Sequence, residues 1–123
     1  MYLLIDNSVD DQVVFHYCLD TNWVQVNLSL QNRSLLEALT VFLDQEKKAI
    51  SDIDGLAVVV GKGRFTATRV VTTLANSLAY TLAIPILAVD GWYEKLEADL
   101  KVAPKGIYIS AKYSAPANIG GKK

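Results

Sequence analysis

The chain contains 123 residues, of which 51% are hydrophobic and 20% are charged, and its formal net charge is −1. This length suits one domain with one core, and the composition is globular rather than disordered. Residues 101–123 hold five lysines and no acid, so the rest of the chain is net acidic. This distribution argues against a large nucleic-acid-binding surface on the body of the protein. We interpret the basic tail as a solvated chain end, with RNA or an acidic partner as the alternative contact.

Several classes of protein are disfavoured by simple features of the chain. The single cysteine, Cys18, cannot form an internal disulfide, which fits a reducing compartment. The first residues, MYLLIDNS, contain no basic leader, and no stretch approaches the roughly 20 apolar residues of a membrane span. We therefore expect a cytoplasmic protein without a membrane anchor.

Three strands and a helix are predicted in the first part of the chain. Residues 2–5 and 12–19 are largely apolar, and residues 23–30 alternate between apolar and polar side chains. Turn-forming residues separate the three segments, so we predict an antiparallel meander. Ser34 and Glu37 then have the spacing of a capping box, and the leucines after them recur at the helical period. A helix therefore follows the meander.

The second part of the chain alternates between buried strands and helices. Residues 56–60 and 86–89 are continuous apolar runs, which are typical of buried parallel strands. Between them, residues 66–82 predict a helix with two apolar sides, of which one can pack on the sheet and the other needs a neighbouring helix or another protein. Its larger stripe is Val70, Leu74, Leu78 and Leu82, and its smaller stripe is Ala67, Val71, Ala75, Ala79 and Ala83. Residues 92–100 predict a short third helix, and residues 107–109 a last strand.

The order of the predicted elements defines a fold class. A β-β-β-α-β-α-β order implies a mixed sheet with helices packed on it. This is the layout of an α/β, ribonuclease-H-like domain, which also forms one lobe of actin-like and sugar-kinase-like ATPases. We therefore predict a single lobe of this type.

The loop GKGRFTATR, residues 61–69, follows a buried strand and opens a helix. It has neither the Walker spacing nor the third glycine of the dinucleotide fingerprint. A loop that leads into a helix N-terminus can still bind an anion, and Lys62, Arg64 and Arg69 would help. The structural interpretation, which we favour, is that Gly61 and Gly63 allow a tight turn and that a threonine caps the helix.

The other candidate catalytic or metal-binding residues lack the partners that such a site needs. Asp6 stands where actin-like ATPases place a metal-binding aspartate, but its loop has no glycine, and Asp10 and Asp11 would repel a phosphate. ATP hydrolysis is therefore not expected. His16 and Cys18 share one face of a strand without an evident third metal ligand, so we interpret both as core residues. We predict no catalytic residue, metal site or cofactor.

The segment from residue 53 to residue 92 resembles the TsaB (YeaZ) family of the tRNA threonylcarbamoyladenosine pathway. The family motif reads G-x-G-P-G-S-F-T-G-L-R-[IV], followed later by I-P-x-x-x-V. The matching residues are Gly61, Gly63, Phe65, Thr66, Arg69, Val70, Ile84, Pro85 and Val89. The start, LLIDNS, is similar to the family's I-L-x-I-D-T-S. The resemblance covers residues 1–92, which we take as the family's N-terminal lobe, with residues 93–123 as a short helix and basic tail of the same domain. Lys62 and Arg64 depart from the motif, as do Ala67 and Val71, which replace glycines.

The resemblance implies a role in protein association. TsaB is a non-catalytic relative of ATPases that forms a heterodimer with its catalytic paralogue TsaD through the first two helices of its N-terminal lobe. This agrees with the spare apolar side of the second predicted helix. The expected interface residues are Leu35, Ala38, Leu39, Phe42, Ala67, Val71, Ala75, Leu78 and Ala79. The expected motif loop comprises Gly61, Lys62, Gly63, Arg64, Phe65, Thr66 and Arg69.

Three functions stay open on the sequence alone. The first is a non-catalytic TsaB-like subunit that supports a TsaD-like enzyme and meets tRNA only through that complex. The second is a nucleotide- or anion-binding ATPase-like lobe, and the third is a self-associating structural protein. An Ala75→Arg change is expected to abolish association under the first and third and to leave the fold intact. The alternative to any association is that both helices pack only within this chain.

Overall fold

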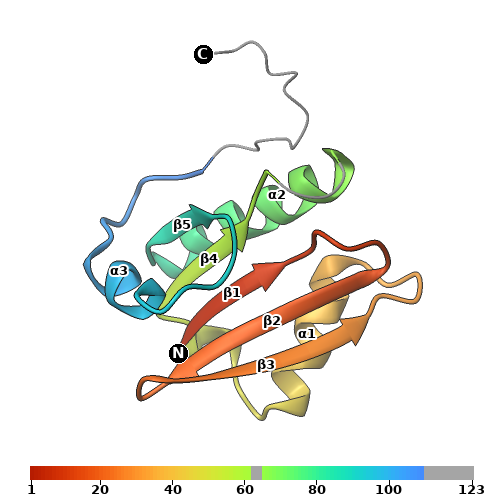
Figure 1. The fold of residues 1–123 in the computed structure, drawn as a ribbon, viewed down its shortest axis with the longest axis horizontal. Helices are drawn as coiled ribbons and strands as arrows, with labels where there is room; N and C mark the ends of the chain where they lie inside the picture. The colour runs from red at the N-terminus through yellow and green to blue at the C-terminus, as the bar shows by residue number, and fades with distance from the viewer. Residues whose placement is uncertain (62–64, 110–123) are drawn as a thin grey trace.

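The computed structural model describes residues 1–61 and 65–109, with residues 65–68 described by their backbone alone. Its centre is a five-stranded sheet in the order β3-β2-β1-β4-β5 (Figure 1). The strands are β1 (Tyr2–Asp6), β2 (Gln12–Leu19), β3 (Asn22–Ser29), β4 (Gly55–Val59) and β5 (Ile86–Val89). The first three are antiparallel, whereas β1, β4 and β5 are parallel. The predicted meander and mixed sheet are confirmed.

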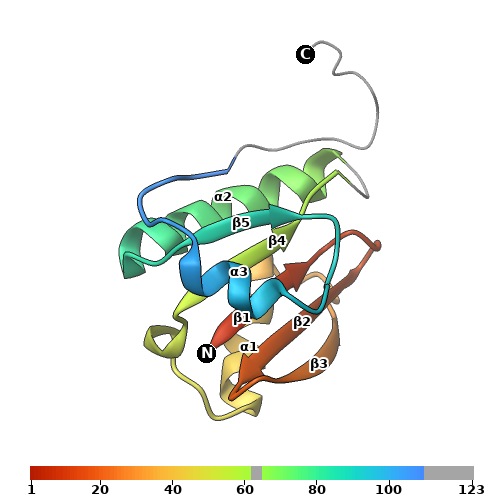
Figure 2. The same ribbon diagram turned by 60° about the vertical axis from the view of Figure 1, so that its left-hand side comes forward.

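Helices cover both faces of this sheet. They are α1 (Leu35–Gln45), α2 (Phe65–Leu82) and α3 (Leu96–Val102), and a 3₁₀ turn, η1 (Ile50–Asp52), precedes β4. Figure 2 shows α3 in front of the sheet and α1 and α2 behind it. The connection from β3 through α1 brings β4 beside β1, and the crossover through α2 brings β5 beside β4, so the three strands are parallel neighbours, as the apolar runs predicted.

Each face of the sheet has its own hydrophobic cluster. Under α1 and α2, the rings of Phe15 and Phe42 stack with centroids 4.5 Å apart. Under α3, Leu96 and Leu100 are fully buried against a cluster that includes Leu4. Because successive residues of β1 point to opposite faces, both clusters draw on one strand. The helix α3 is therefore part of the same three-layered fold.

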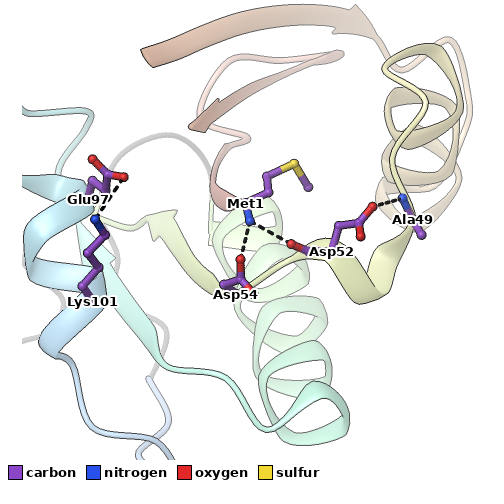
Figure 3. Close-up of polar contacts among 6 residues, drawn as sticks. All are labelled: Met1, Ala49, Asp52, Asp54, Glu97 and Lys101. Carbon is purple, nitrogen blue, oxygen red and sulfur yellow. Dashed lines mark hydrogen bonds and ion pairs between the residues drawn. The ribbon is translucent and has the colours of Figure 1, made fainter. Parts of the chain in front are cut away.

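The start of β1 is fixed by polar contacts to the segment that enters β4 (Figure 3). The amino group of Met1 donates to the carbonyl oxygen of Asp52 at 2.9 Å and forms an ion pair with the carboxylate of Asp54. The carboxylate of Asp52 in turn accepts from the amide of Ala49 at 2.8 Å. These contacts join the first strand to η1 and thereby help to set the parallel register of β1 and β4.

Two predicted elements differ from the structure. The third helix begins at Leu96 rather than at residue 92, since Trp92 and Tyr93 are irregular and a turn at Glu94 and Lys95 precedes the helix. The predicted strand over residues 107–109 is wrong, because this segment is irregular and pairs with no strand among the described residues. The backbone of Ile109 instead bonds to the side chain of Asn76 on α2.

Candidate interface between the first two helices

The helix α1 begins at the predicted capping box. Ser34 Oγ accepts from the amide of Glu37 at 3.1 Å, and Glu37 Oε1 accepts from the amide of Ser34 at 2.8 Å. The hydrogen bond from the Ser34 amide lowers the pKa of Glu37, since it stabilises the charged carboxylate. The box satisfies two backbone N–H groups that the helix itself leaves unpaired. It fixes where α1 starts.

The interface residues predicted on α1 lie in the core of the chain. Leu35, Ala38, Leu39 and Phe42 are all buried against the sheet. Ala38, Leu39 and Phe42 are 0% exposed and cannot contact a partner directly, whereas Leu35, at 5%, also borders a surface groove. The residue assignment on α1 therefore needs correction, because the leucine periodicity marks the face that packs on the sheet. The interface itself stays a prediction.

The same correction applies to α2. The described members of its predicted interface, Val71, Ala75, Leu78 and Ala79, are buried in the same core, and the side chain of Ala67 lies outside the described residues. Small side chains let a helix approach a sheet closely, and Ala75 and Ala79 lie in the core cluster that α2 shares with β4. Part of the larger stripe faces outward instead. The sequence indicated two apolar sides correctly, but described members of both stripes pack in the core, and Val70 is the exposed member of the larger stripe.

The outward side chains of α1 and α2 border a groove of about 560 Å³. Leu36 and Val70 are its most exposed apolar members, at 53% and 45%, and Leu74 is partly exposed. The groove is lined by Ser34, Leu35, Leu36, Arg69, Val70, Thr73, Leu74 and Ser77. Exposed leucine and valine side chains thus share this groove with hydroxyl groups and an arginine at its border.

Sequence reasoning missed most of the polar border of this groove. Thr73 and Ser77 stand one turn apart on α2, on the side that carries Val70. Leu36 was predicted as part of the periodic apolar face of this helix, yet its side chain is 53% exposed. Arg69, which was predicted as part of the motif loop, lines the groove with an exposed side chain.

The motif loop is described only at its two ends. Gly61 has a φ of +80°, a conformation that residues with a Cβ atom rarely adopt, which agrees with a turning role. Lys62, Gly63 and Arg64 lie outside the described residues. Phe65 and Thr66 open α2, and their side chains are likewise not described. The structural role of this loop stays a prediction, with anion binding as the alternative.

The strand-end aspartate of ATPase-like folds is engaged locally in this chain. Asp6 Oδ1 accepts from the amide of Ser8 at 3.0 Å and from its hydroxyl at 2.6 Å. Burial lowers the pKa of His16, and the nearby charge of Asp6 partly opposes this shift. Burial likewise raises the pKa of the Cys18 thiol, so both groups are held in their neutral forms. The described residues contain no group of three side chains that could hold a metal ion.

Within the described residues, none of the helices could span a membrane. The third helix and the two longer ones all pack on the sheet instead.

The sheet order and the helices on both faces define a ribonuclease-H-like α/β domain, the fold that also forms one lobe of actin-like ATPases. Residues 31–114 match the model of a family described as TsaD, tRNA N6-adenosine threonylcarbamoyltransferase, and the chain belongs to this family.

Two solved structures are similar to the chain. One is described as YeaZ from Pseudomonas aeruginosa, with 27% sequence identity and a TM-score of 0.61 over 72% of this chain and 43% of that one. The other is described as an uncharacterized protein with similarity to peptidase YEAZ from Pseudomonas aeruginosa, with 26% identity and a TM-score of 0.60 over the same shares. The chain thus spans less than half the length of either structure. A search of curated proteins gave no match. The predicted resemblance to the TsaB (YeaZ) family is confirmed.

Proposed function

We propose that this chain is a TsaB-like, non-catalytic partner subunit that supports a TsaD-like enzyme in the threonylcarbamoyladenosine modification of tRNA. Its own part is to dock on that enzyme in the cytoplasm and to stabilise its active conformation. Contact with tRNA is indirect, through the complex. The family membership and the similarity to YeaZ support the pathway, and the surface of the two helices supports the docking role.

The observation that carries the proposal is the groove between α1 and α2. Leu36 and Val70 come from different helices and are both about half exposed at one groove. Two apolar side chains at one site lose contact with water together when a partner helix covers them. The hydroxyls of Thr73 and Ser77 are exposed beside them and can pair with polar groups of the partner.

The local contacts of Asp6 support a non-catalytic role. Its carboxylate oxygen already accepts two hydrogen bonds from Ser8, in the position where an actin-like ATPase would use an aspartate to hold a metal. Two further acidic residues, Asp10 and Asp11, stand in the same loop and repel phosphate groups. The loop after β1 therefore favours a role without nucleotide hydrolysis.

Isothermal titration calorimetry with the TsaD-like protein of the same source tests the docking role. Leu36→Glu and Val70→Asp place a charge in the groove, and each is expected to weaken binding by about 30-fold or more, as for a central interface residue. The glutamate falls in the first turn of α1, where the helix dipole favours it. Folding is therefore expected to survive this change.

The matched control is Val102→Asp, because Val102 is also an exposed valine on a helix but lies at the end of α3, on the other face of the sheet. It is expected to leave binding unchanged. Equal loss of affinity in all three variants would contradict docking at the groove. If titration with ATP alone releases heat, and the Arg69→Ala variant does not show this heat, the result would favour a nucleotide- or anion-binding lobe instead.

A further inference from the structure

The segment after α3 crosses from one face of the sheet to the other. It starts from α3, which packs on the cluster around Leu4, and the side chain of Ile109 packs against the opposite cluster, under α1 and α2. Figures 1 and 2 show this blue segment leaving α3 and running toward α2. We call residues 103–109 the strap. The path passes the edge of the sheet that β5 forms.

Asn76 holds the end of the strap by both halves of its amide. Its Nδ2 donates to the carbonyl oxygen of Ile109 at 2.8 Å, and its Oδ1 accepts from the amide of Ile109 at 3.0 Å. A neighbouring β-strand offers the same donor and acceptor pair to an extended residue. The side chain of Asn76 thus recognises backbone, whatever side chain the bound residue carries.

Two further contacts flank this pair of hydrogen bonds. The rings of Tyr80 and Tyr108 meet with centroids 6.5 Å apart, one turn along α2 from Asn76. Ile109 adds its apolar side chain to the core cluster. Three independent contacts therefore hold a segment that has no regular secondary structure.

The strap is also short relative to the path that it follows. A seven-residue segment reaches at most about 23 Å, and its path crosses layers that stack about 10 Å apart on each side of the sheet. Gly106, at a φ of +83°, turns the strap partway along this path. The seven residues, with this turn included, therefore leave little spare length between α3 and Asn76 of the same chain.

We propose that the outer flank of α2, built on Asn76 and Tyr80, is a docking site for an extended peptide segment, and that its occupant is the strap of the same chain. The docked strap ties α3 to α2 around the β5 edge. Asn76 stands next to Ser77, which lines the groove, so the strap steadies the helix that carries half of that surface. The site needs no partner protein and is independent of the proposed function.

Amide hydrogen exchange of the full chain, followed residue by residue by NMR, tests the site. Asn76→Ala is expected to speed exchange at the Ile109 amide by about tenfold, as the loss of its hydrogen-bonded partner predicts. The neighbouring Ser77→Ala change is the matched control and is expected to leave this rate unchanged. The amides of β1 report that each variant remains folded.

Strap length provides a second variant. Deleting Lys105 and Gly106 leaves a reach of about 17 Å, so the Ile109 amide is expected to exchange as fast as in Asn76→Ala. Inserting two glycines after Gly106 is expected to preserve its protection. Three results would overturn the proposal: an unprotected Ile109 amide in the unmodified chain, no effect of Asn76→Ala, or protection that depends on protein concentration, which indicates a strap exchanged between two copies.

Discussion

A larger side chain at position 75 tests whether Ala75 lies in the core or at an interface. Ala75 is 0% exposed and lies on the side of α2 that faces the sheet. Ala75→Leu adds three carbon atoms where no space is left, and such overpacking costs about 1–3 kcal/mol. Unfolding entropy of about 2.1 cal/mol/K per residue gives roughly 0.26 kcal/mol/K for a chain of this length. The expected fall in Tm is therefore about 4–12 °C.

Thermal unfolding followed by far-UV circular dichroism measures this change. The matched control is Ala98→Leu, at an exposed position on α3, whose Tm is expected to stay within about 2 °C of the unmodified chain. An Ala75→Leu variant with unchanged Tm and weakened association would refute the packing described above. The Ala75→Arg variant is expected to fold poorly, since it buries an unpaired charge as well. It is therefore unsuitable as a test of association.

Two further predictions concern a helix cap and a tyrosine. Ser34→Ala removes the cap of α1 and is expected to cost about 1 kcal/mol, or about 4 °C in Tm, whereas Ser34→Asp should restore most of the loss; equal melting of both variants would contradict a capping role. The hydroxyl of Tyr93 donates to Asp99 at 2.6 Å, and this bond raises the pKa of Tyr93 to about 12. Because the neutral phenol is stabilised in the fold, its contribution to stability is full below about pH 10 and is lost as the pH rises towards 12. Ultraviolet titration of the phenolate should show Asp99→Asn lowering this pKa, and an unchanged titration would contradict the hydrogen bond.

The sequence predicted the fold well because its signals were local. The alternation of β3, the apolar runs of β4 and β5 and the capping box at Ser34 each reflect the burial or the hydrogen bonds of their own segment. The direction in which α2 presents its two apolar sides depends instead on the sheet beneath it. Alanines are as compatible with a close helix pair as with a close sheet, so Ala75 was assigned to the wrong side.

The candidate site was predictable in part. The two helices that border the groove were named, and Arg69 was singled out, although as part of a loop. Thr73 and Ser77 carried no signal, because exposed hydroxyl residues on a helix are common and chemically unspecific. The strap gave a misleading signal, since the apolar run at residues 107–109 is typical of a strand. Only the three-dimensional structure shows that the side chain of Asn76 forms the hydrogen bonds of the Ile109 backbone.

Light scattering coupled to size-exclusion chromatography tests the central claim most directly. The chain is measured alone and mixed with the TsaD-like protein of its own source, together with Val70→Asp and the control Val102→Asp. The proposed function predicts a mixed 1:1 species that Val70→Asp abolishes and Val102→Asp preserves. No mixed species with the unmodified chain, or one that Val70→Asp leaves intact, would contradict docking through the groove between α1 and α2.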